Sequence, residues 1–277
     1  MSAAFFGNDA HLKMIIEQCD RTLPIITSKP VTIINTCVIC MIERLHAGVL
    51  CINPLFSHYL GESRIQFGLG ILLRALHLDY LIMLNVLEII NRNRTNGESG
   101  MKELEWYCHT MLSDGAKHTL HLFKHADVPD LVRQRLYSDL VKRNPECFKP
   151  YANNGTMPEL LITDTLSPKQ IINKLKSSSM PWLAAKDHAY QFYSKYDHFT
   201  KLFSTISAQD FTREFIHLAE AIRELPRSFG IMLTLALLST GDQSLTEITK
   251  VVGKHTASID AQEKKEKEEA KSFNPFA

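Results

Sequence analysis

Three side chains suited to acid–base chemistry are distributed over two amphipathic segments, with Arg74 in the first and Ser194 and His198 in the second. They combine a fixed cation, a hydroxyl group and an imidazole that titrates near neutral pH. Such a set could supply a general base, a hydrogen-bonding partner and a positive charge for a developing anion. Cleavage of RNA through its own 2′-hydroxyl needs a base and a cation but no metal. The residues would support that chemistry if they meet.

The two segments must be helical for these side chains to converge. At about 100° per residue, segment 63–93 gathers its polar residues within roughly one third of its circumference. Those residues are Gln66, Arg74, His77, Asn85, Glu88 and Asn91. In segment 182–199, the i, i+4, i+7, i+11 spacing puts four polar residues on one face. They are Asp187, Gln191, Ser194 and His198. The two stripes could face one cleft; alternatively, one faces water and the other bonds locally.

Asp79 stands apart from the polar stripe, on an otherwise apolar side of segment 63–93. A carboxylate in an apolar face must find a partner or be neutralised. We therefore expect Asp79 to be buried and paired, most simply with an arginine or with backbone donors.

Other groups of cysteine and histidine give no convincing metal or cofactor site. Cys37-x-x-Cys40 could be a redox pair or half of a metal site, but no second C-x-x-C accompanies it. Two small apolar side chains in a buried helix are the favoured interpretation. His118, His121 and His125 share one helical face, which could bind zinc. A weakly basic, solvated face is the commoner outcome, so we predict neither metal nor cofactor.

Composition excludes several classes of protein. The 277 residues include 31 basic and 30 acidic side chains, a formal net charge of +1, so the chain is not a strongly basic nucleic-acid coat. Local basic patches remain, for example Lys169, Lys174 and Lys176. The motifs GxxxxGK[ST], GxGxxG and GxSxG are absent, which excludes a P-loop nucleotide hydrolase and argues against an α/β-hydrolase.

Helical signals dominate the chain, and strand signals are poor. We predict an all-α, multi-helix bundle of about nine helices around a long central apolar helix at 63–93. The expected helices are 9–22, 31–52, 63–93, 101–126 (with a break near 114–115), 129–143, 167–177, 182–203, 208–225 and 229–252. Most of these boundaries rest on proline, glycine and serine signals.

The same signals suggest how the chain is divided. An N-terminal helical half at 1–145 precedes a linker loop at 146–166. A C-terminal helical half at 167–255 is expected to pack on the first, and a charged tail covers 256–277. The closing Phe273-Asn274-Pro275-Phe276 could dock into a groove, although a frayed terminus is the commoner outcome.

The sequence predicts neither a targeting signal nor a membrane-spanning segment. The N-terminus lacks the basic and apolar regions of a signal peptide. Polar residues interrupt the apolar stretch 67–90, and stretch 229–238 is too short to span a bilayer. We therefore expect a cytoplasmic protein with reduced thiols and no membrane partner.

The stretch from Gly68 to Asp79, together with Ser194-x-x-x-His198, resembles a group of uncharacterised bacterial all-helical proteins. In that group, an arginine followed by an acidic residue on one long helix accompanies a downstream Ser-x-x-x-His. The group is similar to HEPN domains, which are helical bundles, often dimeric, of toxin–antitoxin and antiviral defence systems. The resemblance covers about residues 60–205. The ribonuclease signature of HEPN domains, an arginine four to six residues before a histidine, is absent; Arg213 and His217 have three residues between them.

The resemblance implies an effector that binds or cleaves RNA as a metal-independent ribonuclease. In that role His198 would be the general base, Ser194 its hydrogen-bonding partner and Arg74 the cation that stabilises the phosphorane. Asp79 would orient Arg74 or a partner helix. The alternative is a non-catalytic helical module that binds a protein. Expected partners are therefore RNA, another protein or a second copy of the chain.

Overall fold

The protein is all-helical throughout the part that the structure, a computed structural model, describes: residues 2–58, 65–93, 98–151, 156–162, 167–178, 190 and 211–272. The predicted all-α class is thereby confirmed. Eight α-helices and no strand lie within these residues: α1 (Ser2–Thr27), α2 (Ile33–His58), α3 (Ile65–Asn93), α4 (Glu98–His125), α5 (Asp130–Arg143), α6 (Pro168–Lys176), α9 (Phe211–Thr240) and α10 (Ser244–Ser272). Of the helix expected at 182–203, only Tyr190 lies within the described residues.

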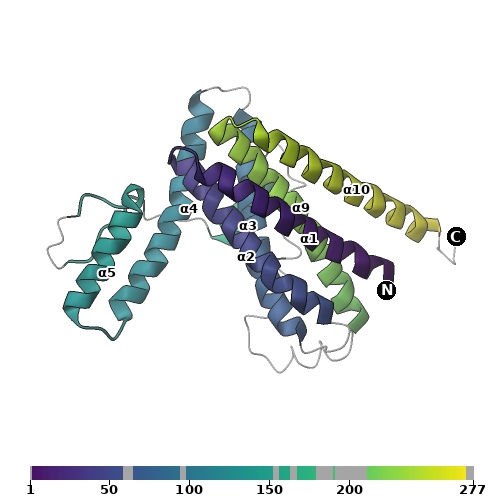
Figure 1. Cartoon of the computed structure of the whole chain (residues 1–277), viewed down its shortest axis with the longest axis horizontal. Helices are drawn as coiled ribbons and strands as arrows, with labels where there is room; N and C mark the ends of the chain where they lie inside the picture. The colour runs from purple at the N-terminus through teal and green to yellow at the C-terminus, as the bar shows by residue number, and fades with distance from the viewer. Residues whose placement is uncertain are drawn as a thin grey trace.

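Helix α3 lies at the centre of the bundle, where α2, α4, α6 and α9 all pack against it. Helix α1 lies against α2 and α9, and α10 covers α9 and α1 (Figure 1). The core between these helices contains fully buried aliphatic and aromatic side chains such as Leu45, Phe56, Leu73 and Phe229. Segments far apart in sequence thus share one core, with α9 between the N-terminal helices.

Three prolines lie inside helices, although each was expected at or beyond a helix boundary. Helix α1 continues through Pro24, α2 through Pro54 and α9 through Pro226. An internal proline costs about 3 kcal/mol, whereas burying one large apolar side chain returns about 1.5–3 kcal/mol. Fully buried side chains follow each proline: Ile26, Phe56 and Phe229. Continued burial therefore offsets the lost hydrogen bond. Helix α4 likewise passes unbroken through 114–115.

The boundary predicted between 225 and 229 is instead found at 241–243. Gly241 has a φ of 64°, the left-handed conformation that ends helices, and its N–H bonds to the carbonyl of Leu237. The Asp242 side chain then accepts a hydrogen bond from the backbone N–H of Ser244, at the start of α10. The residues expected to form a charged tail continue α10 as far as Ser272.

A smaller lobe extends from the bundle, built from the second half of α4, α5 and the segment that follows α5 (Figure 1). The segment expected as a linker loop begins with a 3₁₀ turn, Pro145–Cys147, and pairs Phe148 with Leu160 in an antiparallel bridge. Phe148 packs with Tyr137 and Leu120 in a small core of its own. The lobe is therefore joined to the bundle chiefly through α4, whose first half packs on α2 and α3.

Two of the described helices are long and apolar enough to cross a membrane by length and composition alone. They are Ile33–His58 and Gly68–Asn93, each with a mean hydropathy of 1.5 over its best window. In the second helix 67% of that window is buried inside the protein, compared with 44% in the first. Core helices of soluble proteins pass the same test, and α3 has the central position of such a helix.

Candidate functional site

Helix α3 presents its two predicted functional side chains on different sides. Arg74 and Asp79 are five residues apart, which is about 140° around a helix. Arg74 is half-buried and contacts Tyr190, whereas Asp79 is buried and faces α2. Ser194 and His198 lie outside the described residues. Of the four predicted site residues, the structure therefore places Arg74 and Asp79, and it does not bring these two together.

Arg74 makes a contact that ties α3 to the segment carrying Ser194 and His198. Its Nη2 donates a hydrogen bond of 3.5 Å to the Tyr190 hydroxyl, and its guanidinium carbon lies 5.3 Å from the centre of the Tyr190 ring. This geometry is that of a cation–π contact. Tyr190 also packs against the cluster formed by α3 and α6, which includes Leu81 and Leu175.

Much of the polar stripe of α3 is buried inside the bundle. His77, Asn85 and Glu88 are all less than a tenth exposed, while Asn91 is exposed. The Nε2 of His77 lies 3.0 Å from the carbonyl oxygen of Ala221 in α9. Buried polar groups of this kind are retained where they satisfy a specific partner. His77 therefore joins α3 to α9 rather than facing bulk water.

Helix α6 packs on α3 and brings Lys174 close to α4, beside the C-terminal end of α3. Its start is fixed by a capping box, in which Ser167 and Gln170 satisfy each other's backbone N–H groups. The Nζ of Lys174 lies 5.7 Å from the centre of the Tyr107 ring and 4.0 Å from Glu103. The basic segment of α6 identified in the sequence is thus adjacent to the helix that bears Arg74.

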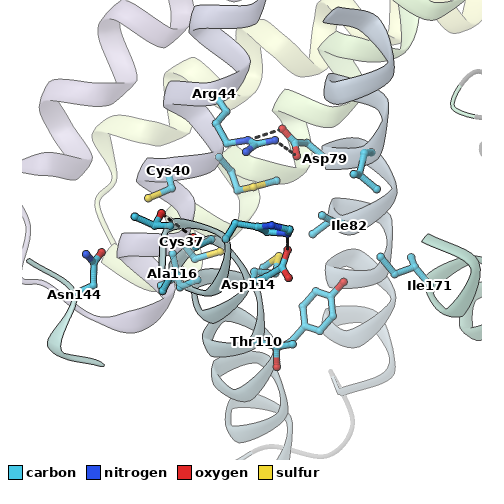
Figure 2. Close-up of a pocket in the computed structure, with 18 of the residues that line it drawn as sticks. Cys37, Cys40, Arg44, Asp79, Ile82, Thr110, Asp114, Ala116, Asn144 and Ile171 are labelled. Carbon is cyan, nitrogen blue, oxygen red and sulfur yellow. Dashed lines mark hydrogen bonds and ion pairs between the residues drawn. The ribbon is translucent and has the colours of Figure 1, made fainter. Parts of the chain in front are cut away.

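Asp79 forms a bidentate ion pair with Arg44 of α2 (Figure 2). The Nε and Nη2 of Arg44 each donate a hydrogen bond of 3.0 Å to one oxygen of the Asp79 carboxylate. Burial raises the pKa of Asp79, and the charge and hydrogen bonds of Arg44 oppose that rise without cancelling it. The expectation that Asp79 is buried and paired with an arginine is confirmed. Its partner lies on α2, so the contact joins Asp79 to a neighbouring helix and not to Arg74.

The Arg44–Asp79 pair borders a cleft of about 480 Å³ between α2, α3 and α4, and Leu140 of α5 and Ile171 of α6 also line it. Its walls are largely apolar and include Met41, Leu78, Ile82, Met111 and Ile171. A second ion pair lies on the α4 side, where Nε2 of His118 is 3.7 Å from Asp114 (Figure 2). A mainly apolar cleft with a few converging polar groups is typical of a small-molecule site.

Cys37 and Cys40 also line the cleft, but their thiols are poorly suited to redox chemistry. Cys37 is 1% exposed and makes a hydrogen bond with the thiol of Cys108, which together with burial raises its pKa well above the usual value. Burial also raises the pKa of Cys40. All six cysteines are free. Since the thiolate is the reactive form, the raised pKa of both thiols favours the interpretation as apolar side chains over a redox pair.

The histidines on α4 make local contacts. His118 faces Asp114, and the rings of His121 and His125 lie 4.5 Å apart. Within the described ranges, no three histidine, cysteine, aspartate or glutamate side chains are close enough together to hold a metal ion.

Arg44 and the cleft were not identified from the sequence. The lone carboxylate of Asp79 predicted an arginine as its partner, yet the chain offers many arginines and spacing within one helix cannot select among them. The available signal was Glu43-Arg44 in the largely apolar stretch 33–52, where a cation also needs a partner or access to water.

Comparisons with protein-family models, with curated proteins and with solved structures found no match to the chain. The chemistry must therefore be argued from its own residues.

Proposed function

We propose that the protein is a HEPN-like helical effector that binds and cleaves RNA without a metal, in the cytoplasm of a bacterium and as part of a defence or toxin system. The observation that carries the proposal is the contact between Arg74 and Tyr190. It links the one cation of the predicted catalytic set to the segment that carries the other two members.

Helical spacing extends this link. Ser194 and His198 follow Tyr190 by four and eight residues, and residues four apart in a helix lie on nearly the same face. If the helix predicted at 182–203 forms, the face that meets Arg74 at Tyr190 would also present Ser194 and His198 towards α3. His198 would then accept the proton of the RNA 2′-hydroxyl, Ser194 would orient the imidazole, and Arg74 would stabilise the phosphorane.

A path for the RNA backbone lies alongside. Lys174 is on α6, which packs on α3, and Lys169 and Lys176 are on the same short helix. Lysines bind phosphate groups by charge and without sequence preference. The proposal therefore places single-stranded RNA across α3 and α6, with its scissile phosphate at Arg74.

A second function is favoured by one observation in the α4–α5 lobe. Several large apolar side chains there are strongly exposed: Leu122 by 68%, Leu131 by 63% and Leu161 by 52%. A bound protein would cover large apolar side chains of this kind. A non-catalytic module that binds a protein, or a second copy of this chain, would use this lobe and would leave RNA intact.

The test compares RNA cleavage by the unaltered chain with cleavage by Ser194→Ala and His198→Ala, in the presence of EDTA. The proposal expects cleavage by the unaltered chain, a loss of at least a hundredfold for His198→Ala, and a smaller loss for Ser194→Ala. His125→Ala, an exposed histidine at the end of α4, is the matched control and should keep full activity. All variants are compared by circular dichroism and melting temperature.

Two results would contradict the proposal. Full cleavage by both variants would mean that this face is not the active site. No cleavage by the unaltered chain under any condition would favour the interaction module. In that case, pull-downs with and without residues 273–277, which follow α10 and lie outside the described residues, would test the terminal Phe273–Phe276 motif as a docking peptide.

A further inference from the structure

The two ion pairs bordering the cleft share an orientation that the proposed function does not use. In the first pair, the side chain of Arg44 is 59% exposed and that of Asp79 only 6%. In the second, His118 is 77% exposed and Asp114 43%. In both pairs the carboxylate is the more buried side chain, and the arginine or histidine is the more exposed one. The more exposed member of each pair is therefore the one that carries N–H donors.

Arg44 keeps donors available for such a molecule. Asp79 engages the Nε and Nη2 atoms, so the N–H groups of Nη1 are not used in that pair. Because the bidentate contact fixes the guanidinium plane, these remaining donors are held in place before anything binds. A planar carboxylate is the group that best matches a guanidinium edge.

The rest of the cleft favours an apolar body on the same molecule. Beyond the ion pairs, the walls are formed by aliphatic and thioether side chains such as Leu78, Ile82, Met41 and Met111. Its volume of about 480 Å³ falls within the usual range of small-molecule sites, roughly 300–1,000 Å³. An inorganic anion would leave these walls without a partner, whereas a hydrocarbon chain or ring would cover them.

We propose that the cleft between α2, α3 and α4 binds a small carboxylic acid with an apolar body, its carboxylate on Arg44 and its hydrocarbon part against the Leu78, Ile82 and Met111 wall. His118, the other exposed nitrogen donor in the cleft lining, offers an N–H to the same carboxylate. The site is separate from the face of α3 that bears Arg74. Ligand binding can therefore be tested independently of RNA cleavage.

Binding is tested by calorimetry and thermal shift with hexanoate, decanoate and 3-phenylpropanoate. Decanol and decylammonium have the same hydrocarbon chain as decanoate but lack the carboxylate, and serve as the comparison ligands. At least one carboxylate should bind with one-to-one stoichiometry, and at least tenfold more tightly than its alcohol and ammonium counterparts. Absence of binding by all three acids would overturn the proposal. Equal binding of decanoate, decanol and decylammonium would also overturn it, since that is non-specific adsorption.

Gly115 provides a variant that blocks the cleft without touching either ion pair. It lines the cleft on α4, and a Cβ placed there would meet nothing within 4 Å. Gly115→Leu should fill the space and abolish binding, while Gly115→Ala, the matched control, should retain it. Both replace glycine in a helix by a better helix former, so neither should lower the melting temperature. Unchanged binding in Gly115→Leu would place the ligand elsewhere.

A second variant tests the carboxylate contact itself. Arg44→Met combined with Asp79→Leu removes both charges together and so leaves no unpaired carboxylate in the protein. The double variant should lose the preference for decanoate over decanol, while decanol binds as before. A preference retained in the double variant would rule out Arg44 as the recognition group. RNA cleavage should be unchanged in Gly115→Leu, which separates the two sites.

Discussion

Polar side chains on the two sides of α3 find different kinds of partner. On the side facing α2, Asp79 and Arg44 form a charged pair in which the cation is largely in water. On the side facing α9, His77 is fully buried and meets a backbone carbonyl. An uncharged carbonyl can be satisfied in a dry interior by one hydrogen bond, whereas a charge there needs a counter-charge and access to water. The charged pair is accordingly found at the edge of a cleft, and the contact between imidazole and carbonyl is found in the core.

The largest effect expected from this comparison is for Arg44→Met. Removing the arginine leaves the buried Asp79 carboxylate without its counter-charge, which we expect to cost about 3 kcal/mol of unfolding free energy. Asp79→Asn leaves only an exposed cation, and should cost about 1 kcal/mol or less. Urea unfolding of both variants measures the difference.

The double variant Arg44→Met/Asp79→Leu is the control for that experiment. It should recover most of the stability lost in Arg44→Met, because both charges are gone. Similar losses in the two single variants would break the comparison, since they would mean that the pair is equally buried at both ends.

On the α9 side, we expect His77→Leu to cost about 2 kcal/mol, because the buried carbonyl of Ala221 loses its side-chain partner. Asn91→Ala, on the same polar stripe but exposed, should change stability by less than about 0.5 kcal/mol. Thermal melts of the two variants separate the buried part of the stripe from its solvated end. Equal losses would show that burial does not set the cost.

A third polar contact extends the comparison to α1 and α10. His11 and His255 lie 2.6 Å apart, Nδ1 to Nε2, and Arg223 and Arg227 of α9 are close by. Both arginines are themselves paired, with Glu266, Asp260, Glu263 and Glu224. Burial, His255 and the two arginines lower the pKa of His11 to about 4.

The sign of the pH effect follows from that lowered value. An unfolded histidine has a pKa of about 6.5, so the unfolded chain takes up a proton at a higher pH than the folded one. Stability is full above pH 6.5 and falls on acidification towards pH 4. Between pH 7 and pH 5 the loss from His11 should be about 1–2 kcal/mol. His11→Gln should flatten this dependence, measured by urea unfolding at both pH values, and His125→Gln should not. A slope unaltered by His11→Gln would contradict the assignment.

The smallest effect is expected at Tyr190. Tyr190→Leu removes a cation–π contact from Arg74 and should cost about 0.5–1 kcal/mol, whereas Tyr190→Phe keeps the ring and should cost less. The informative readout is RNA cleavage by the same two proteins. A loss of cleavage in Tyr190→Leu that is larger than its loss of stability would indicate that the contact positions the catalytic segment.

Helical content could be predicted from the sequence because apolar spacing and capping residues act locally. Ser167 and Pro168 marked the start of α6 correctly, and Pro129 marked the start of α5. Proline failed as a boundary signal at Pro24, Pro54 and Pro226, where burial on both sides exceeds the local cost. That balance depends on which helices pack together, and local sequence does not contain it.

The candidate site, too, could be predicted only where local sequence determines it. The isolation of Asp79 on an apolar face predicted its burial and the type of its partner. The choice of Arg44, 35 residues away on another helix, required the packing of α2 on α3. The cleft itself is a space left between three helices, and no residue pattern within a single helix specifies such a space.

The position of α9 has a consequence for how the chain is made. About 180 residues separate the end of α1 from the start of α9, yet the two helices share one core. At 5–20 residues per second, a ribosome needs roughly 10–40 s to synthesise that interval. During that time the apolar faces of α1, α2 and α3 that α9 will cover stay open to self-association. Nascent chains ending before residue 240 should therefore depend on chaperones, and folding should complete only after α9 leaves the exit tunnel.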